Sequence, residues 1–248
     1  MMFVAAALLG LIAGAAHGQE SAYELPIAVD PFEQQVHRAY TAAQGLPDDD
    51  VSQVAIDSGG AIVAATERGA AVFDGERWQP RTAPFPEGFS ESDLSEQQLT
   101  DLHELAGDNL AIRAAAEHQG ELALAADTGL YVWNEHGWRM ALPRQGAVRW
   151  APVDVRAVVY DESGTLWFAS PQGVGYRVSN DEWTLFTGAD GLPYNDFTCM
   201  AAGPKGVWFG TANGAIHFRD GQWHFRQGRR WLLDNYVRDI AVDAEGNA

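Results

Sequence analysis

The side chains that could perform chemistry are scattered along this sequence without a recognised catalytic spacing. Seven histidines show no H-E-x-x-H pattern or other metal-ligand spacing, at positions 17, 37, 103, 118, 136, 217 and 224. Ser170 and Ser179 lack the glycine context of a nucleophile elbow. We therefore expect no catalytic centre, no metal and no cofactor in this segment, and we place His217 and His224 on strand faces.

The acidic run Asp48–Asp50 is the local candidate for a calcium site. Ca²⁺ prefers carboxylate oxygens, but an EF-hand repeats its oxygen ligands along a loop, and this run has no such period. Asp side chains also accept hydrogen bonds from backbone N–H groups in turns. Turn capping is therefore the favoured interpretation of these three residues.

Aromatic residues offer a second candidate surface. The tryptophans could stack against sugar rings, but four of them recur at equivalent points of a repeated pattern: Trp78, Trp138, Trp183 and Trp223. Packing between repeated sheets explains that recurrence better than a binding surface does. The cluster Arg229-Arg230-Trp231 is a local cation–aromatic group, and we interpret it as ordinary surface.

Composition limits the class of protein and the partners. The chain has 248 residues, of which 46% are apolar and 20% charged, so it can bury a substantial core. Its net charge of −18 repels phosphate backbones and anionic lipid surfaces. The sequence therefore predicts a folded protein that does not bind nucleic acid.

The first residues differ from the rest of the chain. An apolar run from Phe3 to Ala16 is followed by small residues at the spacing that a signal peptidase accepts. We assign residues 1–18 to a signal peptide, 19–34 to an N-terminal lead, and the protein to the periplasm or the secreted fraction. Cys199 is the only cysteine and cannot form an intrachain disulfide, so packing must supply the stability.

A short pattern recurs along the chain: an acidic residue, two spacers and a glycine. With one degenerate copy, it occupies residues 57–60, 117–120, 161–164, 203–206 and 243–246. The glycines are 60, 44, 42 and 40 residues apart, so the unit is a little over 40 residues long and the first interval holds an insertion. Such a period indicates a solenoid or a propeller.

Each repeat contains the signals of four short strands. An apolar strand precedes the turn, as at Val155 and Val158, and an apolar strand with a loop glycine follows it. Stretches such as TLWFAS and GVWFGT do not alternate, so both sheet faces must be covered. The position after this apolar run is always small, as expected where sheets approach closely: Ala65, Ala125, Ala169 and Gly210.

The predicted fold is therefore all-β, a β-propeller with four recognisable four-stranded blades plus the start of a fifth, and an incomplete ring. The propeller spans residues 35–248, with an insertion at about 80–107. In the insertion we expect a helix over Asp93–Leu105 with Leu94, Leu99, Leu102 and Leu105 as its apolar face. Gln35–Thr41 is expected to form an outermost strand.

The stretch GLPYNDFTCMAAGPKGVWFGTANGAIHF, residues 191–218, resembles the two-component regulator propeller repeat. That repeat has a GLP-x-N lead, a V-x-x-I strand, a D-x-x-G turn, an L-W-x-G-T strand and a closing Gly-led strand. Gly45-Leu46-Pro47 opens a second copy, and the resemblance covers residues 36–248. It is weaker in blades 1 and 2, where Val63 and Ala123 replace the Trp of the second strand.

The resemblance implies a periplasmic sensor module, the N-terminal piece of a longer chain. A membrane-bound histidine kinase would follow residue 248, and binding of a small molecule, glycan or protein would bias a signalling homodimer. The alternative is a secreted binding scaffold attached to a separate enzyme domain, for example a carbohydrate-active one. An apolar span beyond residue 248 would favour the sensor, and paired carboxylates in a soluble domain would favour the enzyme.

Propeller geometry predicts where a ligand would bind. Loops that enter each inner strand, and loops that join second and third strands, share one face around the axis. The candidate ligand-binding residues on this loop face are Asp49, Asp50, Arg68, Asn195, Asp196, Asn213 and Asn235. We expect Pro193 to fix the chain direction in one of these loops, with Asn195 and Asp196 capping turn amides.

Overall fold

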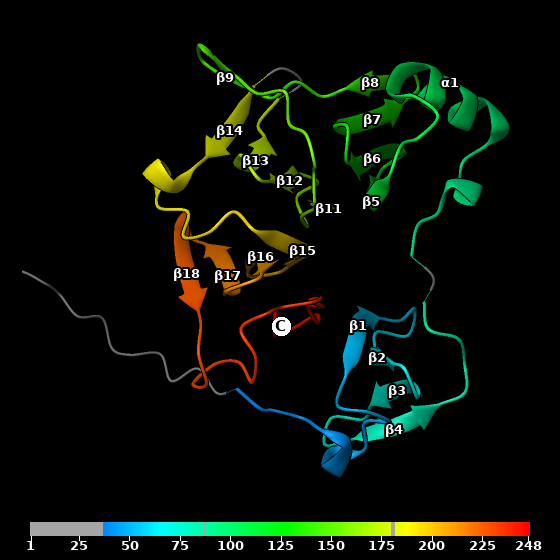
Figure 1. Ribbon diagram of the computed structural model, residues 1–248, viewed down its shortest axis with the longest axis vertical. Helices are drawn as coiled ribbons and strands as arrows, with labels where there is room; N and C mark the ends of the chain where they lie inside the picture. The colour runs from blue at the N-terminus through cyan, green and yellow to red at the C-terminus, as the bar shows by residue number, and fades with distance from the viewer. Residues whose placement is uncertain (1–36, 87, 180–181) are drawn as a thin grey trace, which may run out of the picture. The chain divides into compact units, whose positions relative to one another are not determined.

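Four antiparallel sheets of four strands each, which we call blades, make up most of the protein (Figure 1). The computed structural model describes residues 37–86, 88–179 and 182–248. The segments assigned to a signal peptide and an N-terminal lead lie outside these residues. The strand order in every blade follows the chain order, so each blade is the up-and-down meander that the repeats predict.

Each blade runs from an inner strand to an outer strand (Figure 1). Blade 1 contains β1 (Val51–Ile56), β2 (Ile62–Thr66), β3 (Gly69–Phe73) and β4 (Trp78–Arg81), and blade 2 contains β5 (Ile112–His118), β6 (Glu121–Ala126), β7 (Leu130–Asn134) and β8 (Gly137–Met140). Blade 3 contains β11 (Ala157–Tyr160), β12 (Leu166–Ser170), β13 (Gly173–Arg177) and β14 (Trp183–Phe186), and blade 4 contains β15 (Phe197–Gly203), β16 (Gly206–Thr211), β17 (Gly214–Arg219) and β18 (Gln222–Arg226). The four recurring tryptophans all lie in outer strands.

The recurring acidic residue caps the turn between the first and second strands. Oδ1 of Asp161 accepts hydrogen bonds from the N–H groups of Ser163, at 2.9 Å, and Thr165, at 3.0 Å. Asp57 in blade 1 and Asp243 in the fifth repeat accept equivalent bonds. The glycine that closes the blade 3 turn has a φ of 79°, a conformation that strains any residue with a Cβ atom. The D-x-x-G pattern is therefore a turn that satisfies its own backbone amides.

The GLP lead is a second repeated device. In η3 (Gly188–Asp190), the Thr187 side chain accepts a hydrogen bond from Ala189 N–H, and Gly191 ends the turn with a φ of 85°. Leu192 then enters the hydrophobic core, where it is buried. The same arrangement occurs at η1 (Ala42–Gln44), which ends at Gly45. The lead thus anchors the crossing between blades with one buried leucine.

Blades 2, 3 and 4 pack on one another through continuous hydrophobic clusters. Leu130 and Val132 of blade 2 share a buried cluster with Phe168 of blade 3. Trp167 on the same strand, β12, belongs to a second cluster that reaches Phe209 of blade 4. Every residue of β12 is buried, because neighbouring blades cover both faces of its sheet.

The small residue of the second strand lies at a close approach between blades, as predicted. A Cβ atom on Gly210 would lie 2.5 Å from the Cys199 sulfur and 2.9 Å from a methyl carbon of Val237 in the fifth repeat. Ala125 and Ala169 are fully buried at the equivalent positions of blades 2 and 3. The prediction holds less well for blade 1, where Ala65 is partly exposed.

The insertion folds against blade 2. After η2 (Glu91–Asp93), Ser95 caps α1 (Glu96–Ala106), whose first residue lies three residues later than the sequence pattern predicted. Leu102 is fully buried and Trp138 Nε1 donates a 2.8 Å hydrogen bond to the Gln98 carbonyl oxygen. The assignment of Leu105 to the apolar face was wrong, since it is 43% exposed. A three-residue spacing drifts by about 60° per step around an α-helix, which carries Leu105 off the buried side.

A two-stranded hairpin, β9 (Arg144–Gln145) and β10 (Val148–Arg149), joins blade 2 to blade 3 and was not expected. Gln145 Oε1 accepts a 2.9 Å hydrogen bond from Leu185 N–H, and Gly146 N–H donates to Glu182. These bonds attach the hairpin to the free edge of β14. Covering an outer edge in this way limits pairing with other chains.

Two expected strands are missing from the described residues. His37–Thr41 forms no strand, and Thr41 instead caps η1. Val237–Ile240, the expected inner strand of the fifth repeat, pairs with no second strand, although the turn at Asp243 forms. The described blades do not close a ring. Within the same residues, no helix has the length and apolar character needed to cross a membrane.

Candidate functional site

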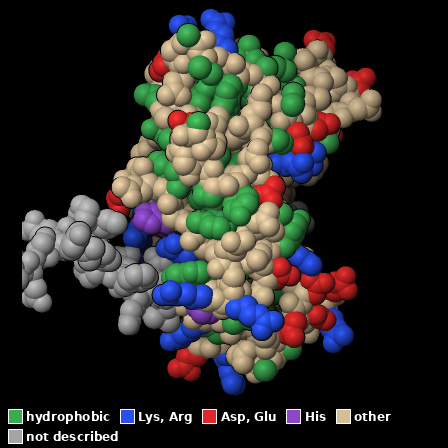
Figure 2. Space-filling view, turned by 60° about the vertical axis from the view of Figure 1, so that its left-hand side comes forward, with side chains coloured by type: hydrophobic (Ala, Val, Ile, Leu, Met, Phe, Trp, Pro, Cys, Tyr) green, Lys and Arg blue, Asp and Glu red, His purple; other side chains and the backbone are tan. Residues whose placement is uncertain are grey.

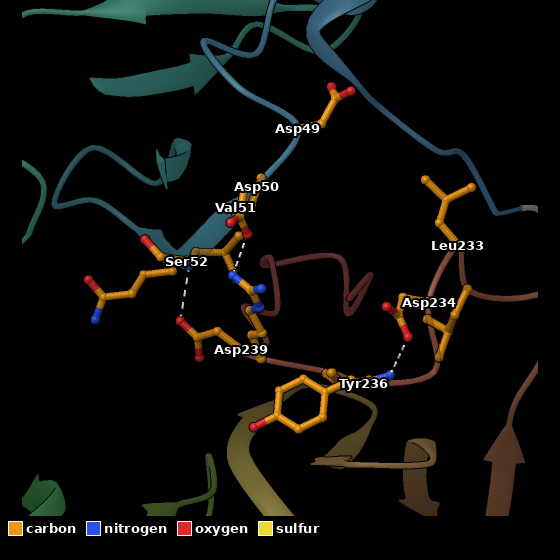
Figure 3. A pocket seen from close by; sticks show the side chains of 13 residues that line it. Asp49, Asp50, Val51, Ser52, Leu233, Asp234, Tyr236 and Asp239 are labelled. Carbon is orange, nitrogen blue, oxygen red and sulfur yellow. Dashed lines mark hydrogen bonds and ion pairs between the residues drawn. The ribbon is translucent and has the colours of Figure 1, made fainter. Parts of the chain in front are cut away.

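A hollow lies where segment 232–239 faces the inner strand of blade 1 (Figure 3). Its volume is about 500 Å³. We call it the loop-face groove, because the loops that enter the inner strands form its walls. Its lining residues are Asp49, Asp50, Val51, Ser52, Gln53, Val54, Leu232, Leu233, Asp234, Tyr236, Val237, Arg238 and Asp239.

Polar contacts hold the two walls of the loop-face groove together. Asp239 Oδ2 accepts a 3.0 Å hydrogen bond from Val54 N–H, and Arg238 forms an ion pair with Asp50 (Figure 3). Burial raises the pKa of the Asp239 carboxyl, and the hydrogen bonds from Val54 and Ile240 only partly oppose this effect. The groove therefore contains one partly desolvated carboxylate that is poorly compensated by cations.

The groove also exposes apolar surface. Leu233 is 71% exposed and Tyr236 is 54% exposed, and both side chains lie at its wall (Figure 3). Asp234 accepts a hydrogen bond from Tyr236 N–H at 3.0 Å, which holds this corner of the segment. A phenol ring beside several carboxylates can bind the hydroxyl groups and apolar face of a polar ligand.

The sequence-predicted residues of blade 1 divide between the groove and its surroundings. Asp49 and Asp50 line the groove, but Asp49 also caps a turn by accepting a hydrogen bond from Ala42 N–H. Arg68 lies outside the lining and pairs with Asp48 at 2.9 Å. Asp48 also accepts a hydrogen bond from Asp50 N–H, so turn capping is confirmed for Asp48 and Asp49, whereas the Asp50 carboxylate pairs with Arg238.

The predicted residues of blade 4 come together away from the groove. The Asn213 side chain donates a 2.9 Å hydrogen bond to the Asp196 carboxylate, which joins two loops of the same face. Asn195 donates to the carbonyl oxygen of Pro171 at 2.6 Å. The prediction that Asn195 and Asp196 cap turn amides was wrong, because their side chains bond to groups on neighbouring loops instead. Their role is to tie adjacent loops together.

Sequence reasoning missed three groove residues that follow the candidate Asn235. Asn235 itself accepts a hydrogen bond from Gly228 N–H at 2.7 Å and lies outside the lining, whereas Tyr236, Arg238 and Asp239 form it. A partial signal was available, because these residues lie in or next to the expected inner strand around Val237 and Ile240, where successive side chains point to opposite faces. Only the fold shows that this face meets blade 1.

Two side chains with reactive potential are inactive in their surroundings. His217 stacks on Trp208 with ring centroids 4.1 Å apart, and desolvation lowers its pKa to about 4. Burial raises the pKa of the Cys199 thiol to about 12, so it stays protonated. In residues 37–248 outside the three undescribed positions, no three His, Cys, Asp or Glu side chains are grouped to hold a metal ion.

Arg226, Arg230 and Trp231 form a local cation–aromatic group. Figure 2 shows Lys and Arg side chains together with Asp and Glu side chains on one face of the molecule. The guanidinium of Arg226 lies 4.7 Å and that of Arg230 5.2 Å from the ring centre of Trp231. This stacking supports the interpretation of the cluster as a packed surface feature.

Comparison with known proteins identifies the fold. The streptogramin B lyase structure matches with a TM-score of 0.50 and 13% identity, over 82% of this chain and 90% of that one. The extracellular domain of BT3049 from B. thetaiotaomicron, described as a hybrid two-component system, matches with a TM-score of 0.46 and 18% identity. No family model and no curated protein matches the chain.

The matched part of the two-component domains is small. The match to the BT3049 domain covers 80% of this chain but only 26% of that domain. The match to the BT4673 domain covers 72% of this chain and 21% of that domain, with a TM-score of 0.38 and 21% identity. At such identities a structural match reports the fold and not the activity. The protein is therefore similar to β-propellers, as the repeats predict.

Proposed function

We propose that the protein is an extracytoplasmic sensing module of the two-component signalling type, which binds a ligand or partner on its loop face. The observation that carries the proposal is the loop-face groove, one wall of which follows the GLP lead at residues 45–47. That lead belongs to the repeat pattern that resembles two-component regulator propellers. The groove supplies carboxylates, one guanidinium and an exposed phenol, which suit binding better than catalysis.

The proposed binding face extends beyond the groove. It includes the loop residues chosen from the sequence: Asp49, Asp50, Arg68, Asn195, Asp196, Asn213 and Asn235. The pair Asp196–Asn213 and the contact from Asn195 to Pro171 join loops of blades 3 and 4 by hydrogen bonds. A ligand that rearranged one of these loops would therefore also shift the loop bonded to it, and binding would affect both blades.

Signal transfer would use the weak contact at the groove. A hydrogen bond and an ion pair connect Asp239 and Arg238 to blade 1 there, and exposed ion pairs contribute little to stability. A ligand seated across the groove adds contacts to both walls and so favours one arrangement of them. In the full protein, we propose that this change reaches a membrane-bound kinase within a homodimer.

The first experiment is to sequence the gene through its natural stop codon. A span of roughly 20 apolar residues followed by a histidine kinase domain would support the sensor proposal. A stop after further blades, or a soluble domain with paired carboxylates, would overturn it in favour of a secreted scaffold or an enzyme-attached binding domain.

A second experiment tests the site itself. Tyr236→Ala in the full-length protein should reduce the ligand-dependent output of the kinase, because it removes an exposed ring from the groove wall. Val178→Ala is the matched control, since Val178 is 61% exposed and does not line the groove. Equal output from the wild type and Tyr236→Ala would contradict a ligand site in the groove.

A further inference from the structure

The inner strands share an irregularity that the repeat pattern does not reveal. In blades 1, 2 and 4 the pairing register with the second strand shifts at the second residue of the inner strand, at Ser52, Arg113 and Thr198. In each case the next residue pairs with the small residue of the second strand, as Gln53 does with Ala65. These positions are β-bulges, which turn a side chain out of the regular ladder.

Blade 3 and the fifth repeat have the equivalent position. Arg156 directly precedes the pair Ala157–Ala169, so it corresponds to the bulged residues of the other blades. Val155 N–H donates to the Ala126 carbonyl of the preceding blade, and Val237 N–H donates in the same way to the Thr211 carbonyl. The residue after each valine is thus equivalent, and in the fifth repeat it is Arg238.

The five equivalent positions hold Ser52, Arg113, Arg156, Thr198 and Arg238. Arginine occupies three of them, although the whole chain has only 16 Lys and Arg residues among 248. The two hydroxyl side chains donate to nearby backbone carbonyls, those of Ala65 and Val237. The longer arginines reach past the backbone to carboxylates on the loops.

Two of the arginines share one carboxylate. Arg113 Nη2 lies 2.7 Å from Asp154 Oδ1, and Arg156 Nη2 donates to Asp154 Oδ2. Asp154 Oδ1 nevertheless accepts no aligned hydrogen bond. The side chains of Arg113, Arg156 and Asp154 are 37%, 40% and 30% exposed, so solvent reaches the group. Two guanidinium groups thus contact one carboxylate.

The position of Asp154 is imposed by its loop. Its φ is 52°, which is uncommon for a residue other than glycine, and its N–H donates a 2.7 Å hydrogen bond to the Asp127 carbonyl. The carboxylate is therefore presented to both guanidinium groups by a constrained backbone. It fills only part of their donor capacity, since each guanidinium carries five N–H donors.

We propose that Arg113 and Arg156 form a binding site for a carboxylate-bearing ligand on the loop face, with Asp154 as the internal group that occupies the site in its absence. A guanidinium binds a planar carboxylate through two parallel hydrogen bonds, and two guanidinium groups on adjacent blades can hold one carboxylate from two sides. The third arginine, Arg238, lies in the loop-face groove and provides a further cation on the same face.

This inference names a class of ligand for the proposed sensor. The biological role of the site rests on the proposed function, but binding itself does not. Binding can be measured on the purified full-length protein without any signalling output. A gene that ends without a membrane span and kinase would overturn the proposed function and leave the binding result standing. The absence of carboxylate binding would overturn this inference and leave the sensor proposal standing.

The test is calorimetric titration with three probes: citrate, digalacturonate and neutral digalactose. We expect the wild type to bind at least one carboxylate probe and not digalactose. A response to citrate alone would identify a free organic acid as the source of the carboxylate, and a response to digalacturonate alone would identify an acidic glycan. Binding should weaken with added salt, because the interaction is charge-assisted and solvent-exposed.

Substitutions decide whether the arginine pair is the site. The double variant Arg113→Gln/Arg156→Gln should bind at least about tenfold more weakly, because charge-assisted hydrogen bonds are lost. Arg149→Gln on β10 makes the same chemical change on an exposed hairpin and should leave affinity unchanged. Asp154→Asn should strengthen binding, since it removes the competing carboxylate, and a misfolded variant could not give that result.

Three results would overturn the proposal. The first is that the wild type binds neither carboxylate probe. The second is that digalactose binds as tightly as digalacturonate, which would make the carboxylates irrelevant. The third is that the double variant keeps wild-type affinity, or that Asp154→Asn weakens binding while its circular dichroism spectrum stays native.

Discussion

The contact between blades 3 and 4 differs in kind from the contact between segment 232–239 and blade 1. Between blades 3 and 4, Trp167 lies against Phe209 and Phe218 with ring centroids 6.4 Å and 5.4 Å apart. At blade 1, the contact consists of a hydrogen bond from Val54 to Asp239 and the ion pair of Arg238. The first contact excludes water, whereas the second leaves a groove of about 500 Å³.

The difference indicates which region contributes most to the free energy of folding, the contact between blades 3 and 4, and which has room for a ligand, the loop-face groove. Aromatic burial gives a large free energy of folding and no room for another molecule. A polar contact contributes little to the free energy of folding, but it leaves hydrogen-bonding groups on the groove walls that a ligand can use. The variants below test this division, and they are ordered by the size of the expected effect.

The largest effect is expected from Phe209→Ala. Phe209 is fully buried between blades 3 and 4, so truncation leaves a cavity and should lower the free energy of unfolding by about 3–5 kcal/mol. Chemical denaturation followed by circular dichroism measures the loss. Val178→Ala, on an exposed residue, should change it by less than about 0.5 kcal/mol. Similar losses from both variants would contradict the tight-interface interpretation.

The next effect tests the close approach of blade 4 and the fifth repeat. In Gly210→Ala the new Cβ atom would lie 2.9 Å from a methyl carbon of Val237 in the fifth repeat, and 2.5 Å from the Cys199 sulfur on the neighbouring strand of blade 4. These segments must therefore separate, at a cost of about 1–3 kcal/mol. Gly188→Ala meets no atom within 4 Å and serves as the control. A melting temperature for Gly210→Ala equal to that of the control would show that the blades are not closely packed there.

Asp161→Asn tests the turns that both regions share. Burial raises the pKa of Asp161, but hydrogen bonds from Ser163, Trp167 and Thr165 outweigh it, so the net pKa is lowered. A lowered carboxyl pKa stabilises the folded state above the unfolded-state pKa, and that contribution is lost as the pH falls through the folded-state pKa.

Asp161→Asn should therefore cost about 1 kcal/mol at pH 7, since the partly exposed charge is screened. The difference from the wild type should shrink as the pH falls below 4, the region of the ordinary Asp pKa of 3.8. Urea denaturation at pH 7, 4 and 3 measures this trend. A difference that is independent of pH would exclude the charge as its cause.

The smallest effect, with the opposite sign, is expected from Asp239→Asn in the groove. Burial raises the pKa of Asp239, so its charged form destabilises the fold above the unfolded-state pKa, and protonation relieves this cost at low pH. The variant should be more stable than the wild type at pH 7, by up to about 1 kcal/mol after screening, and equal to it in acid. A loss of stability at pH 7 would show that the hydrogen bond from Val54 requires the carboxylate.

Much of the fold could be predicted because its signals are local. The turn at Asp161–Gly164 satisfies its own amides, and a tryptophan recurs at the start of each outer strand, so sequence spacing reports both features directly. The small position at Gly210 was also readable, because a close approach leaves no room for a side chain. The helix face that includes Leu105 was predicted wrongly, since a three-residue spacing does not follow a helical stripe.

The candidate site depended on contacts between distant parts of the chain. Sequence placed Asp49, Asp50 and Asn235 on one face, but it could not show that segment 232–239 meets β1 or that Asp239 becomes buried there. It also could not show that Arg113 and Arg156 share Asp154, because bulges depend on the register of paired strands. Repetition of a local pattern thus determined the blade, whereas long-range pairing, which no local signal encodes, decided which side chains meet and where the surface stays open.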